Sequence, residues 1–192
     1  MAFYGKISIQ LDFYRSHRSK FICSCFLLLQ WISEKNDIKT PVCQAANHLY
    51  VGGKVLGGHM EALDFIEANK KDFAIRKCKK IPVSGAFHTS LMKPAQELFN
   101  EAFEGVAIAE PRIPVYSNYD NRIYTSRNYV QKCLIKQMVN TLKWESSMQN
   151  MVKYKSNDQW PKFVECGPGQ SLSTMIKQLN GKIGKRTSCV SA

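Results

Sequence analysis

Apolar and polar residues follow one another along the chain in patterns that predict short strands and amphipathic helices. Residues 42–47 and 54–58 are strand-like, and the glycine pair at 52–53 between them is typical of a tight hairpin turn. Residues 59–69 carry apolar side chains at helical spacing, and extended structure resumes at 73–75. This stretch is therefore predicted to fold as strand, strand, helix and strand.

That order, over residues 38–81, is most of a ferredoxin-like subdomain, in which a first strand and helix normally come earlier. Residues 1–37 show no clear periodic pattern, so we interpret them as an unassigned N-terminal extension and expect the subdomain to be partial. The apolar run at 21–32 is shorter than the roughly 18 residues that a membrane span needs, and no small-residue cleavage site follows it. We expect no membrane span.

The remaining part of the chain, residues 82–192, also mixes helices and strands. The apolar spacing predicts a helix over 91–103, a buried strand over 113–117, helices over 129–139 and 144–154, a strand over 163–166, a glycine turn at 167–169 and a closing helix over 172–179. Strands that alternate with helices are typical of an α/β layer fold. We therefore predict an α/β protein with a small subdomain and a larger second part.

The chain is basic, with 27 Lys and Arg against 15 Asp and Glu, and its formal net charge is +12. This charge favours acidic partners, such as phosphorylated cofactors, an acidic protein or nucleic acid. The basic segment 76–80 either binds a phosphorylated cofactor or an acidic protein, or is simply a solvated edge. Because no aromatic residues interleave with these charges, we expect no nucleic-acid binding.

Seven cysteines form an odd set without the paired spacings of a zinc site. We therefore expect free thiols in a reducing compartment and no bound metal. Cys166 falls inside a predicted strand, where a free cysteine usually packs as a small hydrophobic residue. We expect this side chain in the core.

The segment 82–94 sets His88 in a turn of small residues just before a predicted helix. A histidine can act as a general base when its pKa lies near the operating pH and its second ring nitrogen is held by an acceptor. Gly85 and Ala86 allow a partner to approach closely, and Pro94 falls early in the helix. Taken alone, a histidine in such a turn is more often a surface or helix-capping residue.

Four segments stand out in order along the chain, Pro82–Pro94, Val115–Asn118, Leu142–Glu145 and Phe163–Gly169. Together they resemble malonyl-CoA:acyl carrier protein transacylases, and the sequence around His88 is most similar to the animal mitochondrial branch. The resemblance covers residues 38–192, roughly the C-terminal half of the family. It implies part of an α/β-hydrolase-like acyltransferase core over 82–192, joined to the partial ferredoxin-like subdomain, and a mitochondrial location.

The resemblance also implies a reaction, the transfer of a malonyl group from malonyl-CoA to the phosphopantetheine thiol of acyl carrier protein in type II fatty-acid biosynthesis. Malonyl-CoA is a substrate, and no further cofactor or metal is expected. In the family a serine attacks the thioester, and the histidine that matches His88 takes its proton in a ping-pong mechanism. The carbonyl that orients this histidine falls on Gln137, and Asn118 matches a residue near the active site, where it would orient either His88 or the substrate. Without the resemblance, Gln137 is simply an exposed helix residue and Asn118 a turn residue.

The sequence departs from the family at one decisive point, because these residues contain no Gly-x-Ser-x-Gly nucleophile motif. Gly58-His59-Met60 is superficially similar but has methionine in place of serine, and we interpret it as structural. Two hypotheses follow, a part of the enzyme that lacks the serine half, or a non-catalytic short form that binds acyl carrier protein. In both, we expect the chain alone to be inactive. We also expect it to fold poorly, since uncovered strands expose apolar faces.

Overall fold

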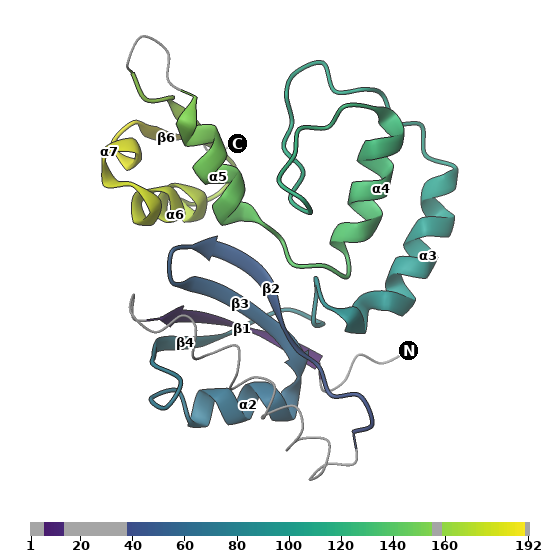
Figure 1. The fold of residues 1–192 in the computed structure, drawn as a ribbon, viewed down its shortest axis with the longest axis vertical. Coiled ribbons are helices and arrows are strands. Elements are labelled where there is room, and N and C mark those ends of the chain that lie inside the picture. Colours follow the sequence, from purple (N-terminus) through teal and green to yellow (C-terminus); the bar gives the residue numbers. More distant parts are fainter. Residues whose placement is uncertain (1–5, 14–37, 155–158, 191–192) are drawn as a thin grey trace.

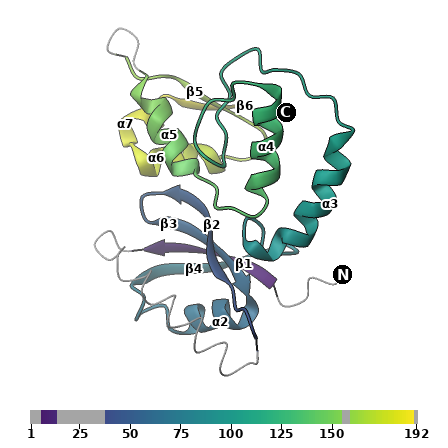
Figure 2. The same cartoon turned by 45° about the vertical axis from the view of Figure 1, so that its right-hand side comes forward.

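The computed structural model describes residues 6–13, 38–154 and 159–190. They form a four-stranded sheet with one helix, α2, against one face, and a second group of helices and strands on the opposite side of the sheet (Figure 1). Helices α5 and α6 of the second group contact strand β2 (Figure 2). In the described part of the chain, no helix is long and apolar enough to cross a membrane.

The small subdomain is an antiparallel sheet with strand order β2-β3-β1-β4. Its elements are β1 (Lys6–Phe13), β2 (Cys43–Tyr50), β3 (Gly53–His59), α2 (Met60–Ala68) and β4 (Ile75–Ile81). The predicted hairpin is confirmed as β2 and β3, and the predicted helix is confirmed as α2. This strand order is the one expected of a ferredoxin-like subdomain.

Strand β1 corrects the expectation that the first strand of this subdomain is absent. It lies between β3 and β4, and Ile9 faces Leu56 on one neighbour and Lys80 on the other. It comes from the region that showed no clear pattern. The apolar run at 21–32, and the place where a first helix would fall, lie outside the described residues.

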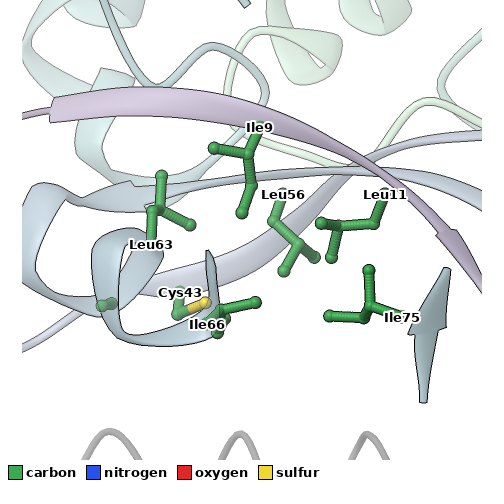
Figure 3. Packing of buried hydrophobic residues seen from close by; sticks show 8 residues of the cluster. Ile9, Leu11, Cys43, Leu56, Leu63, Ile66 and Ile75 are labelled. Carbon is green, nitrogen blue, oxygen red and sulfur yellow. The ribbon is translucent and has the colours of Figure 1, made fainter. Parts of the chain in front are cut away.

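The core of the small subdomain lies between the sheet and α2 (Figure 3). It is built from buried apolar side chains of every strand and of the helix, namely Ile9, Leu11, Cys43, Leu56, Ala62, Leu63, Ile66 and Ile75. Because strand residues alternate between faces, the residues between these ones lie on the opposite face of the sheet. On that face the Tyr50 hydroxyl donates a hydrogen bond to Asp12.

The second part consists mainly of helices, with one pair of parallel strands. Its elements are a 3-10 turn η1 (Ser90–Met92), α3 (Lys93–Glu104), α4 (Arg127–Gln137), α5 (Trp144–Lys153), β5 (Phe163–Cys166), α6 (Ser171–Leu179), α7 (Gly181–Gly184) and β6 (Thr187–Val190). Strands β5 and β6 pair in parallel, and a second core of Met148, Ile176 and Ile183 lies nearby. The predicted helices and the strand at 163–166 are confirmed.

Two expectations for the second part are wrong. Residues 113–117 do not form a buried strand, because Ile113 is 72% exposed and the pairing there is the single bridge between Tyr116 and Ile123. Cys166 is exposed and not in the core. It lies on the face of β5 and β6 that carries Val164 and Val190, which are also exposed. The described residues leave this face uncovered.

We predict that β1 is essential for stability. Leu11 is fully buried and Leu98 on α3 is 69% exposed, so the same truncation at the two positions isolates the effect of burial. Leu11→Ala should lower the free energy of unfolding in urea by about 2–5 kcal/mol. Leu98→Ala should change it by less than about 0.5 kcal/mol. Equal effects would show that β1 does not contribute to the core.

Candidate functional site

His88 lies in the turn between β4 and η1, with its backbone in the left-handed region at a φ of 62°. Residues other than glycine rarely adopt this conformation, although histidine is among those that do. Its cost of about 1–3 kcal/mol must be offset by contacts that hold the turn. One such contact is the hydrogen bond from the His88 backbone N–H to the Met138 carbonyl oxygen, at 3.1 Å.

The imidazole ring of His88 is held by a second carbonyl at the same place. Its Nδ1 atom lies 2.7 Å from the carbonyl oxygen of Gln137. A carbonyl oxygen can only accept, so in the neutral ring the proton is on Nδ1 and the lone pair is on Nε2. This is the tautomer in which Nε2 can remove a proton from another group.

The two carbonyls are available because α4 ends at Gln137. The last carbonyls of a helix have no partner inside the helix and must find one elsewhere. The Ile135 carbonyl accepts from the Gln96 side chain, and the Lys136 carbonyl accepts from the Asn140 side chain. The next two carbonyls accept from His88, so its position follows from the hydrogen bonding of the helix end.

The chain after α4 runs along the edge of the small sheet. The Thr141 hydroxyl donates to the Ala45 carbonyl at 2.6 Å, and Leu142 forms an isolated parallel bridge with Asn47. Beyond this segment the Lys54 ammonium lies 2.7 Å from the Glu145 carboxylate, joining the β2–β3 hairpin to α5. These contacts fix the end of α4 relative to the sheet.

Asn118 is brought to this segment by its backbone. Its carbonyl oxygen accepts a hydrogen bond from the Lys143 N–H at 2.8 Å, and its side chain is exposed. The neighbouring Tyr119 ring lies 5.7 Å from the Lys136 ammonium and 6.0 Å from the Lys143 ammonium. The role of Asn118 in substrate binding stays a prediction.

Sequence reasoning missed Gln44, on strand β2. Its side-chain oxygen accepts a hydrogen bond from the Ser90 N–H, two residues after His88, at 2.8 Å. An exposed glutamine on a strand has no distinctive sequence pattern, so nothing in the sequence pointed to it.

The structural interpretation of Gly58-His59-Met60 is confirmed. The Val42 N–H donates to the Nδ1 atom of His59 at 2.9 Å, so this ring holds the start of β2 against the end of β3. A Cβ atom at Gly58 would lie 2.2 Å from the Val42 carbonyl oxygen. Only glycine fits at this position.

The glycine turn after β5 is organised by Glu165, which is buried. Its carboxylate accepts from the Ser173 hydroxyl at 2.6 Å and from the backbone N–H groups of Leu172 and Ser173, each at 2.9 Å. These bonds, the Ser173 hydroxyl first, lower the pKa of Glu165 to about 2. The carboxylate therefore caps the first turn of α6, while Gly167 and Gly169 supply the positive φ angles of the turn.

The basic segment forms β4, an edge strand of the small sheet. Lys80 is paired with Asp64 at 2.7 Å and with Glu67 at 3.5 Å, and the bond with Asp64 raises the pKa of Lys80. Lys77 and Lys79 are exposed. The strand therefore combines one internally paired lysine with charges that remain accessible to an acidic partner.

The described residues include no group of three or more His, Cys, Asp or Glu side chains placed to hold a metal ion. The chemistry that their arrangement supports is proton transfer at His88.

Comparison with known proteins shows relatives of one kind. A probable mitochondrial malonyl-CoA–acyl carrier protein transacylase of Drosophila melanogaster is 40% identical over 159 residues, 83% of this chain and 42% of that protein. The human mitochondrial malonyl-CoA–acyl carrier protein transacylase is 38% identical over 173 residues, 90% of this chain and 44% of that protein. The chain thus spans less than half the length of these relatives. No protein-family model matches it.

The fold is shared with solved structures. The malonyl-CoA–acyl carrier protein transacylase of Coxiella burnetii matches 100% of this chain and 54% of its own, with a TM-score of 0.81 and 22% identity. The resemblance inferred from the sequence and the α/β acyltransferase fold are both confirmed.

We predict that Glu165 makes stability depend on acid pH. Because its pKa in the folded chain is about 2 and its ordinary value is 4.5, its stabilising effect is complete above pH 4.5 and is lost as the pH falls towards 2. Urea unfolding between pH 5 and 2.5 should therefore show a smaller loss of stability for Glu165→Gln than for the unaltered chain. Glu101→Gln, at an exposed position on α3, is the control and should leave the loss unchanged. If the free energy of unfolding of Glu165→Gln fell with pH as steeply as that of the unaltered chain, the low pKa assigned to Glu165 would be contradicted.

Proposed function

We propose that this chain is the histidine-bearing part of a mitochondrial [acyl carrier protein] S-malonyltransferase. The whole enzyme would transfer a malonyl group from malonyl-CoA to the phosphopantetheine thiol of acyl carrier protein in type II fatty-acid biosynthesis. The observation that carries this proposal is the 2.7 Å contact between His88 Nδ1 and the Gln137 carbonyl oxygen. It leaves Nε2 as the proton acceptor, as a Ser-His acyltransferase requires.

In this mechanism Nε2 of His88 takes the proton of a serine hydroxyl as its oxygen attacks the malonyl thioester. The carbon–sulfur bond breaks, and the departing CoA sulfur receives the proton from His88. The thiol of acyl carrier protein then gives its proton to Nε2 and attacks the acyl-serine, and the serine oxygen leaves with that proton. In both halves positive charge develops on the ring, whose Nδ1–H faces the partial negative charge at the C-terminal end of α4.

A second function is a non-catalytic form that binds acyl carrier protein. It is favoured by the absence of a Gly-x-Ser-x-Gly motif in these 192 residues. The exposed Lys77 and Lys79 on the edge strand would suit an acidic partner. The alternative to a binding role is that lysines on an edge strand merely prevent the strand from pairing with other chains.

The catalytic proposal predicts different effects of two neighbouring contacts. In the protein captured from its native cells, His88→Ala should reduce malonyl transfer to acyl carrier protein by about 10²- to 10⁴-fold, because the proton acceptor is lost. Gln137→Ala should stay within about threefold, because the main-chain carbonyl is retained. Full activity in His88→Ala would refute the proposed role of this residue.

Both functions predict that the isolated 21.9 kDa chain forms no acyl-enzyme. Incubated with malonyl-CoA, it should show no malonyl adduct by intact mass spectrometry, because it lacks the Gly-x-Ser-x-Gly motif that carries the nucleophile. A stoichiometric mass gain would contradict this. If the short form is a carrier-protein binder, a native protein of 21.9 kDa should bind acyl carrier protein, and Lys77→Glu with Lys79→Glu should weaken that binding. A native mass well above this value would instead favour the enzyme.

A further inference from the structure

The turn that carries His88 lies on the face of the small sheet opposite to α2. Gln44 on β2 and Gly57 on β3 are direct partners in the sheet, and Gly57 also pairs with Ser8 on β1. Partners across antiparallel strands point to the same face, so these three residues form one row. Cys43, the neighbour of Gln44, is in the core beneath α2, which places the row on the other face.

This row fits the turn closely at Gly57. A Cβ atom added there would lie 2.8 Å from the Thr89 methyl carbon and 3.5 Å from the Ala86 Cα. Thr89 is fully buried, and its hydroxyl donates to the Ala86 carbonyl at 2.6 Å. Thr89, the residue that follows His88, therefore occupies the space that a side chain at position 57 would fill.

Gln44 holds the turn at the residue that follows Thr89. Its side-chain oxygen accepts the Ser90 N–H at 2.8 Å. His88 is thus restrained from two directions, by the end of α4 at its own N–H and ring, and by the small sheet at the two residues that follow it. A left-handed histidine needs such restraint, because its neighbours must over-determine the backbone.

From this geometry we infer that Gln44 is a positioning residue for His88, acting through the Ser90 N–H to keep the ring on the Gln137 carbonyl. The inference rests on the proposed function only for its consequence, which is that the sheet of the small subdomain orients the catalytic base. The effect of Gln44 on the tautomer of His88 does not depend on that function, and it can be tested in the absence of substrate.

The test is a long-range ¹H–¹⁵N spectrum of the histidine rings in the ¹⁵N-labelled 192-residue chain, with His88→Gln to assign the His88 signals. In the unaltered chain the proton is expected on Nδ1. Gln44→Ala should raise the population of the Nε2–H tautomer about fivefold, the effect of one neutral hydrogen bond. Gln44→Glu, which keeps an acceptor oxygen, should restore the original ratio. Gln149→Ala, which alters a glutamine that contacts Glu145, is the matched control and should have no effect.

A second pair of variants tests the same restraint if Gln44→Ala fails to fold. Gly57→Ala should shift the tautomer ratio by displacing Thr89, and adding Thr89→Ser, which removes the methyl group in the way, should reverse the shift. An unchanged ratio in folded Gln44→Ala, or in Gly57→Ala where Gln44→Ala does not fold, would overturn the inference. So would an equal shift in Gln44→Glu. Failure of malonyl transfer alone would count against the proposed function and not against this result.

Discussion

The hydrogen bonding at the C-terminal end of α4 is the constraint on which the rest of the site depends. A helix end must find partners for its last carbonyls, and here three different residues supply them. The carbonyls of Ile135, Lys136, Gln137 and Met138 are taken by Gln96 on α3, by Asn140, by the His88 ring and by the His88 N–H. One helix end therefore connects α3, the His88 turn and the segment that runs along β2.

Local patterns in the sequence were sufficient for much of the fold. The hairpin, α2 and the helices of the second part were predictable because spacing between apolar residues reports which face is buried. The contact between His88 and Gln137 was not, because a main-chain carbonyl leaves no mark on residue type. Only the resemblance to a family pointed to Gln137, and its role there does not involve its side chain.

The errors have two physical causes. Strand β1 alternates apolar and polar residues from Ile7 to Phe13, a pattern typical of a half-buried strand, and it was overlooked because the residues after it show none. Residues 113–117 and Cys166 were expected to be buried because they are apolar. Composition indicates which residues would gain from burial, but whether they are buried depends on which chain segments cover them.

The uncovered apolar surface and the His88 turn lie on different sheets. Paired parallel strands are normally covered on both faces, and the face of β5 and β6 that carries Val164 and Val190 is not covered by the described residues. The His88 turn instead rests on the small sheet, whose core beneath α2 contains buried side chains from all four strands. The geometry of the proton acceptor is therefore set by two parts together, because the small sheet holds the residues after His88 and the end of α4 holds its ring and backbone N–H. A second part that needs further polypeptide for its stability would leave only the first of these restraints in place.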